Sequence, residues 1–277
     1  FFQAQDGIRD FCLSRGLGDV YKRQDPSLQF LEAYEVSRKN FLRRLQNIDQ
    51  SELTDREVLG LKLITQNLRI QTEGFKFPEE FILIHQRSGV QQYISDVLSI
   101  MPKNSLKDFE DRLERLRKAP EYIGKTIDVL RIGLEKNITP PKITLRDVPQ
   151  QIKNTIPTEI SNSPLLNSFN NFPVSMTEED KDRIVKQAES IVETEVYPAF
   201  VKLYDFLVEE YIPNSNESIA LSDNPDGKEW YKHRARHFTT TQLQPKEIHD
   251  LGLNEVARIK AEMDDVIIKS GFEGSYD

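Results

Sequence analysis

The apolar positions along the chain recur with the period of amphipathic α-helices. Apolar residues follow a mostly helical spacing over residues 28–48 and again over residues 58–68. Thr54 and Glu57 stand three positions apart just before the second stretch, which is the pattern of a capping box at a helix N-terminus. The sequence therefore predicts two successive helices at this end of the chain.

Further amphipathic stretches follow after a segment of different character. Residues 73–89 hold aromatic residues, a proline and a glycine without helical period, so they are expected to be irregular or partly extended. Residues 89–101 and a stretch from Asn104 or Ser105 onward predict two more helices. Pro120 is expected to open a fifth, because a proline costs nothing in the first turn. Short connections between these helices indicate an all-α, multi-helix bundle.

Residues 138–174 interrupt the helical pattern. They contain six prolines and many Asn and Ser residues, and only 144–153 predict a short helix. A long irregular segment in a compact protein is typically a linker or a functional cover. The sequence therefore predicts a long proline-rich loop here.

Two helices are expected in the last hundred residues. Thr177 is placed to cap one that continues to Tyr211, with a kink at Pro198 because a proline inside a helix removes one backbone hydrogen bond. The other begins near Pro245 and stops at Gly271, the residue type that most often ends a helix.

Length and charge exclude several classes of protein. The 277 residues are enough for one large domain or two small ones. No run of about 20 apolar residues occurs, so no membrane span is predicted. The net charge of -8 is spread along the helical stretches, which argues against nucleic acid as a partner.

Residues 1–24 differ from the rest. They show no periodic apolar pattern and no apolar signal core. Residues 6–24 resemble a peptide that recurs at the ends of unrelated predicted proteins and looks like translated sequencing-adapter DNA. We therefore expect 1–24 to be a non-native or disordered leader and 25–277 to be the helical domain. Cys12 lies in the leader, so the domain has no cysteine for disulfides or thiol catalysis.

His233 and His237 stand four positions apart, the spacing of a helical zinc pair. A zinc-peptidase motif needs a glutamate after the first histidine, and Arg234 occupies that position. The three threonines at 239–241 follow an aromatic residue and favour extended chain, in which residues four apart are separated by roughly 13 Å. The sequence therefore predicts no metal site here. His85 and His249 are isolated and are expected to be ordinary polar residues.

The stretches "HQRSGVQQYISDVLSIMP", "EEDKDRIVKQAESIVETEVYPAFVKLYDFLVEEYIP" and "GKEWYKHRARHFTTTQLQPKEIHDLGLNEV" resemble the bacterial family called domain of unknown function 885. The resemblance covers residues 25–277 and corresponds to roughly the N-terminal half of such a protein. It implies a mostly helical zinc metallopeptidase of the gluzincin type, with a deep cleft between two halves. The zinc motif His-Glu-x-x-Pro-Gly-His of the family comes after Asp277, so this fragment is expected to hold no catalytic residue, metal ligand or cofactor.

On this resemblance the fragment forms one wall of the substrate cleft. Zinc and a peptide substrate are expected in the full-length parent only, which is bacterial and compatible with export or a lipid anchor. The extended segment 231–241 is expected to face the peptide. The candidate residues of this wall are Tyr231, His233, His237, Thr239 and Thr240.

Two alternatives stay open. The segment 231–241 could equally be a plain structural edge with no contact to a substrate. The chain as a whole could be a stand-alone helical interaction module without catalysis, which recruits a protein partner through its proline-rich loop and kinked helix. A His-Glu motif in frame beyond Asp277 favours the peptidase, and a stop codon there favours the module.

Purified residues 25–277 are predicted neither to bind zinc stoichiometrically nor to cleave peptides. Four scattered histidines, with Arg234 where a base is needed, cannot build a three-ligand site with an open position for water. Dialysis against zinc followed by elemental analysis, with a peptide-hydrolysis assay on the same sample, checks both parts. One tightly held zinc per chain that is lost in His233→Ala or His237→Ala would contradict this prediction.

Overall fold

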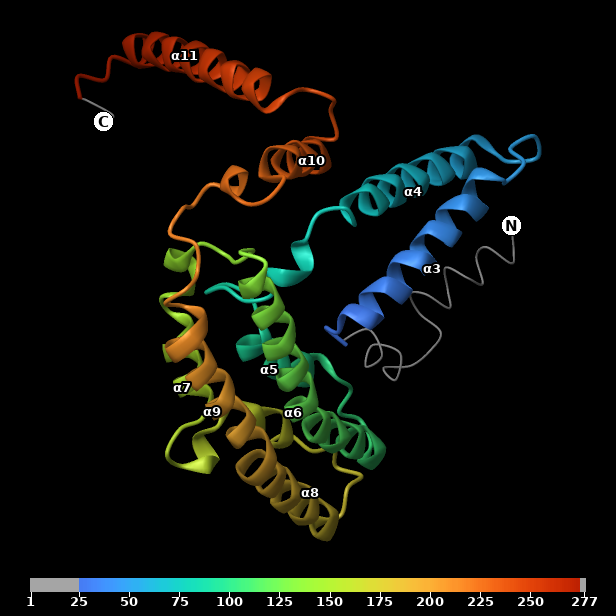
Figure 1. Cartoon of the computed structure of the whole chain (residues 1–277), viewed down its shortest axis with the longest axis vertical. Helices are drawn as coiled ribbons and strands as arrows, with labels where there is room; N and C mark the ends of the chain where they lie inside the picture. Colours follow the sequence, from blue (N-terminus) through green and yellow to red (C-terminus); the bar gives the residue numbers. More distant parts are fainter. Residues whose placement is uncertain (1–24, 275–277) are drawn as a thin grey trace.

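The computed structural model describes residues 25–274, which form nine α-helices and no strand (Figure 1). The expected all-α, multi-helix architecture is confirmed. The expectations for residues 1–24, including Cys12, lie outside the described residues. The helices are α3 (Leu28–Gln46), α4 (Asp55–Gly74), α5 (Val90–Ile100), α6 (Leu106–Glu135), α7 (Val148–Thr155), α8 (Glu178–Ile191), α9 (Tyr197–Asp205), α10 (Gly227–Thr239) and α11 (Pro245–Ser270).

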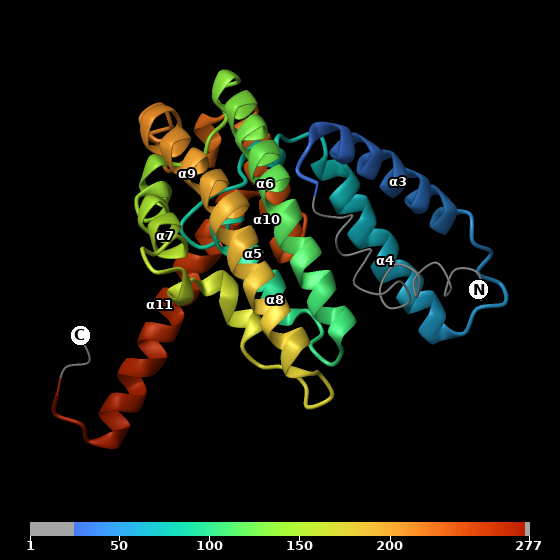
Figure 2. The ribbon, with the colours of Figure 1, turned by 90° about the horizontal axis from the view of Figure 1, so that it is seen from below.

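The helices form a central body with two projecting parts. Helices α5 to α9 pack together in the body, the pair α3 and α4 lies to one side of it, and α11 extends away from it in both views (Figures 1 and 2). The pair has a small core of its own around Leu45, Leu61 and Leu68. Helix α10 touches both α4 and α11, so it joins the two projecting parts.

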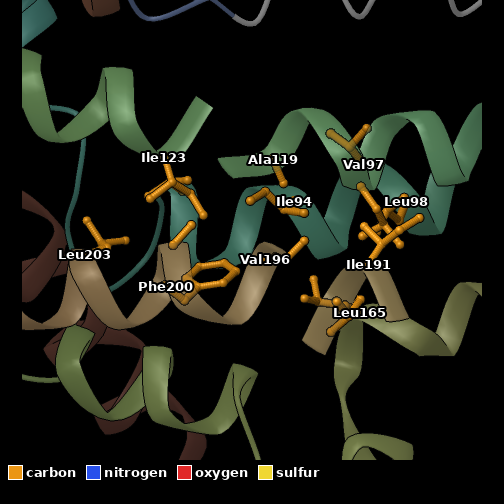
Figure 3. Close-up of a cluster of buried hydrophobic side chains, with 14 of the residues drawn as sticks. Ile94, Val97, Leu98, Ala119, Ile123, Leu165, Ile191, Val196, Phe200 and Leu203 are labelled. Atoms are coloured by element: carbon orange, nitrogen blue, oxygen red, sulfur yellow. The ribbon is translucent and has the colours of Figure 1, made fainter. Parts of the chain in front are cut away.

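The main core lies where α5, α6, α8 and α9 meet. Their facing side chains interdigitate, with Leu165 from a 3₁₀ turn filling one end (Figure 3). Leu98, Phe200 and Leu203 are fully buried there. Burial of this many large apolar side chains is the main favourable term in the folding of the body.

Helix α6 runs unbroken through Pro120, so the expectation that this proline opens a new helix was wrong. Leu116, Ile123 and Leu130 are all buried and continue one apolar stripe across the proline. A proline inside a helix costs roughly 3 kcal/mol. Burying the stripe on both sides of it in one core outweighs that cost.

The proline-rich segment 138–174 is neither a linker nor a cover. It consists of α7 and short 3₁₀ turns, so the expected helix near 144–153 is present but lies a few residues later. Leu145, Ile152 and Phe169 belong to the main core and are almost fully buried. The prolines prevent long helices, while the apolar residues between them fix the chain to the body.

The helical run predicted from Thr177 to Tyr211 is present but is not uniformly α-helical. Thr177 caps it, since its hydroxyl accepts a hydrogen bond from the backbone of Asp180 at 3.1 Å. A π-helical turn at Val192–Val196 ends two residues before Pro198. A π turn is a common way for a helix to absorb a local distortion. A second π turn at Phe206–Tyr211, which the sequence did not suggest, ends the run.

The extended segment expected at 231–241 is absent, because residues up to Thr239 continue helix α10. Thr239 is the last helical residue, and its hydroxyl donates to the carbonyl of Ala235 at 2.9 Å. Thr240 follows with a positive φ of 55° and ends the helix. The β-branched residues thus affect only the helix end, while buried Trp230 and His233 hold the rest in helical form against α4 and the segment after it.

Helix α11 begins and ends where the sequence predicts. Gln244 and Glu247 form a capping box at its start, and Gly271 ends it with a φ of 68°. None of its residues is buried. Across residues 25–274, no helix combines the length and apolarity that crossing a bilayer requires.

Two glycines of α6 provide a matched test of its packing. A Cβ on Gly133 would lie 2.8 Å from both the carbonyl oxygen of Ile138 and the Cβ of Phe81, whereas a Cβ on Gly124 would meet no atom within 4 Å. Gly133→Ala should lower the free energy of unfolding by about 1–3 kcal/mol through overpacking. Gly124→Ala should raise it by up to about 1 kcal/mol through better helix propensity. Urea unfolding of both variants checks this, and equal effects would contradict the close packing at Gly133.

Candidate functional site around helix α10

Helix α10 is attached to the body by a stacked aromatic pair. Trp230 is 2% exposed, and its ring lies parallel to that of Phe77 with 6.2 Å between the ring centroids. The indole N–H of Trp230 donates to Oε1 of Glu79 at 3.0 Å. A buried tryptophan combines a large apolar contact with the need for one acceptor. The crossover segment, residues 75–89 after α4, supplies both here.

His233 is a second point of attachment. It is 7% exposed, and its Nε2 lies 2.9 Å from the carbonyl oxygen of Ile70 in α4. A carbonyl only accepts, so Nε2 carries a proton, and Nδ1 is an acceptor in the neutral form of the ring. This Nδ1 is buried without a hydrogen-bond partner. Gly74 allows the approach, because a Cβ there would lie 3.0 Å from Cε1 of His233.

Ion pairs at the edge of α10 add to these contacts. Nη1 of Arg234 lies 3.0 and 3.3 Å from the two carboxylate oxygens of Glu79, which also accepts from Trp230. Arg236 pairs with Glu73 of α4, and its hydrogen bond lowers the pKa of that carboxyl. Partly exposed pairs of this kind contribute roughly 0.2–1 kcal/mol each. They orient α10 more than they stabilise the fold.

His233 and His237 are one helical turn apart, so the expected separation of an extended chain was wrong. Even so, Nε2 of His233 is engaged with Ile70, and His237 is exposed. Within the described range, no group of three or more His, Cys, Asp or Glu residues is arranged to hold a metal ion. The residues present do not fit a catalytic zinc.

One face of α10 lines a pocket of about 470 Å³, which we call the acidic pocket. Helices α3 and α4 and the crossover segment form its other sides. Glu80 is half-buried in it, and burial raises the pKa of its carboxyl. The lining residues are Leu28, Leu31, Glu32, Tyr34, Glu35, Gln71, Gly74, Phe75, Phe77, Glu79, Glu80, His233, Arg234 and His237.

The opposite side of α10 lines a shallower pocket of about 770 Å³, the basic pocket. Tyr231 and Phe238 form an apolar floor, and both are more than half exposed. Lys228, Lys232 and Lys246 stand around it. Helix α10 therefore separates two pockets of opposite charge.

The five candidate residues are not brought together. His233 and His237 line the acidic pocket, and Tyr231 lines the basic one. Thr239 and Thr240 line neither and serve to end the helix.

Sequence reasoning missed Glu79, Glu80 and Gly74. Glu79 meets Trp230 across 151 positions of sequence, a pairing that no local pattern indicates. The one available signal was the composition of the crossover segment, where two glutamates interrupt an apolar and aromatic stretch.

Comparisons with known proteins place the chain in context. A family model described as "Bacterial protein of unknown function (DUF885)" matches residues 13–277. The fold is similar to a crystal structure described as "the putative lipoprotein from Colwellia psychrerythraea", with a TM-score of 0.74 and 19% sequence identity. The match covers 90% of this chain and 44% of that one, so the chain spans less than half of the solved protein. A comparison with curated proteins finds no match.

Replacement of the buried His233 and of the exposed His237 should have different effects on the free energy of unfolding. His233→Ala removes a buried ring and its hydrogen bond to Ile70, and should lower the free energy of unfolding by about 1.5–3 kcal/mol. His237→Ala alters an exposed side chain and should change it by less than about 0.5 kcal/mol. Urea unfolding followed by the fluorescence of Trp230 measures both. Equal losses in the two variants would show that His233 does not attach α10 to α4.

Proposed function

The chain belongs to the bacterial family of unknown function DUF885, and from this premise we propose that it is the N-terminal part of a zinc-dependent metallopeptidase and forms one wall of its substrate cleft. The proposal is based on the resemblance of the sequence to a family that implies zinc peptidases of the gluzincin type. The solved relative is described as a lipoprotein, and a place at the cell envelope is part of the same proposal.

The observation that carries the proposal is the uncovered face of α11. Its 26 residues include none that is buried. Val256, Ile259, Met263 and Val266 are spaced by three and four positions and are each 45–66% exposed. This is the spacing of a helix that packs along a partner, and apolar stripes of this kind mark interaction surfaces. A further lobe, in a protein as long as the solved relative, is the partner that the proposal requires.

Helix α10 suits the role of a cleft wall because it is held firmly while its two sides stay open. Trp230 and His233 fix its position, and the acidic and basic pockets lie on either side of it. Zinc would supply a polarised carbonyl and an activated water in such an enzyme. The role of this chain in the enzyme would be to hold the peptide, since the orientation of a substrate itself contributes strongly to the reaction rate.

The stand-alone interaction module remains the second candidate. The exposed stripe of α11 could equally bind a separate protein. However, the proline-rich segment that was to recruit a partner is packed into the main core, with Leu145 and Phe169 buried. The kinked helix is packed into the same core, with Phe200 and Tyr211 buried, so the module would rest mainly on α11.

The reading frame beyond Asp277 provides the test. The complete product should hydrolyse peptides, lose activity with a chelator and regain it with zinc. Tyr231→Ala and His237→Ala should lower kcat/KM by about tenfold, the effect of losing one positioning contact worth about 1.4 kcal/mol. Their zinc content should stay constant.

His85→Gln is the matched control, because His85 lines neither pocket beside α10. It should leave kcat/KM unchanged. A stop codon directly after Asp277, or a complete product without zinc-dependent hydrolysis, would count against the peptidase. Hydrolysis that is unaffected in both pocket variants would remove the cleft-wall role.

A further inference from the structure

The acidic pocket carries more negative charge than its own contacts neutralise. Four carboxylates and one guanidinium line it, a formal charge of -3 with both histidines neutral. Glu79 is paired with Arg234, and Glu35 with Lys39 outside the pocket. Neither Glu32 nor Glu80 makes an ion pair within residues 25–274, although Glu80 is half-buried. A partly desolvated carboxylate without an ion pair is costly. The charge of Lys136, outside the pocket, acts on Glu80 but does not offset its burial, so the pocket favours a bound cation.

Aromatic rings form the apolar part of the same pocket. Tyr34 and Phe75 meet edge to face with centroids 6.0 Å apart, and Phe77 lies behind them. The negative faces of aromatic rings attract ammonium and guanidinium groups. Cations of the chain itself already lie over two of these rings, since the guanidinium of Arg38 is 4.7 Å from the centroid of Tyr34 and Nζ of Lys76 is 4.9 Å from that of Phe77. The Phe75 ring and the carboxylates without an ion pair remain for a ligand, and together they favour a cation that also carries apolar atoms.

The buried Nδ1 of His233 points to the same chemistry independently. His233 lines the acidic pocket, and its Nε2 proton is committed to the carbonyl of Ile70. In the neutral ring Nδ1 is therefore an acceptor, and within the described residues it has no hydrogen-bond partner. A buried acceptor without a partner destabilises the structure, and a ligand that donates a hydrogen bond to it offsets this cost. Ammonium and guanidinium groups donate and do not accept.

We propose that the acidic pocket binds a positively charged nitrogen group of a peptide, either the guanidinium or ammonium of a basic side chain or the free amino terminus. The inference rests on the proposed function, since it names the class of peptide that the cleft wall would hold. A pocket of about 470 Å³ has room for one such side chain together with part of the adjoining backbone.

Trp230 gives a direct reporter of binding. It is the only tryptophan in the chain, and it contacts Phe77 and Glu79, both of which line the acidic pocket. The purified chain is titrated with four small amide probes: acetyl-arginine amide, alanine amide with its free amino group, acetyl-alanine amide and acetyl-aspartate amide. Calorimetry is run in parallel.

At least one of the two cationic probes should bind saturably and alter the Trp230 fluorescence. Binding of acetyl-arginine amide alone identifies the side chain, and binding of alanine amide alone identifies the amino terminus. The neutral and anionic probes should bind at least about tenfold more weakly, because a charge-assisted contact is worth about twice a neutral one. Comparable binding of all four probes, or no binding, overturns the proposal.

Variants locate the binding in this pocket. Glu80→Gln and Glu32→Gln keep the side-chain shape and remove a charge, and each should weaken the cationic probe about fivefold. His233→Gln retains a donor for Ile70 and lacks the Nδ1 acceptor, so it should also weaken binding. Glu195→Gln, an exposed glutamate outside the pocket, is the matched control and should have no effect.

Circular dichroism confirms that each variant is folded. Full binding by both glutamate variants would place the cation elsewhere and overturn the proposal. The titration needs no hydrolysis, so its result is separable from that of the peptidase test. Cation binding by a chain whose complete parent is inactive would refute the proposed function alone. Zinc-dependent hydrolysis without cation binding would refute only this inference.

Discussion

The stacking of Trp230 on Phe77, with the indole N–H bonded to Glu79, is the contact on which the rest of the candidate site depends. It joins α10 to the crossover segment, and Phe81 of that segment in turn packs at Gly133 of α6. A continuous chain of buried contacts therefore runs from the main core to α10. Without it, α10 would be held by the buried hydrogen bond of His233 to Ile70 and by partly exposed ion pairs, which are weak and salt-sensitive.

Local signals predicted the parts of the fold that local physics decides. The caps at Thr54 and Thr177, and the stop at Gly271, act within one turn of backbone and were readable from the sequence. Pro120 was misread because its cost is local, whereas the gain that outweighs it comes from a core assembled by four other helices and turns. The threonines near 240 were misread for the same reason. Their preference for extended chain acts on each residue singly, while α10 is stabilised by contacts to residues about 150 positions away.

Because residues 231–239 are helical and not extended, the geometry of the candidate site also differs from the expected one. In a strand, Tyr231, His233 and His237 would share one face, because alternate residues point the same way. In a helix, residues three and four apart share a face, so His233 stands above His237 while Tyr231 joins Phe238 on the other side. The sequence pointed to these residues but did not show that they lie on two sides of one helix. This arrangement gives one segment of chain two pockets of opposite charge.

The two pockets also differ in how firmly the elements that form their walls are attached to the rest of the structure. The acidic pocket is bounded by α3, α4, the crossover segment and α10, all of which are attached to one another by buried contacts. The basic pocket includes Gln244, Pro245 and Lys246 at the start of α11, a helix with no buried residue. Its shape therefore depends on the position of α11. On the proposed function, a partner packed against the apolar stripe of α11 would complete the basic pocket, whereas every wall of the acidic pocket belongs to the described residues.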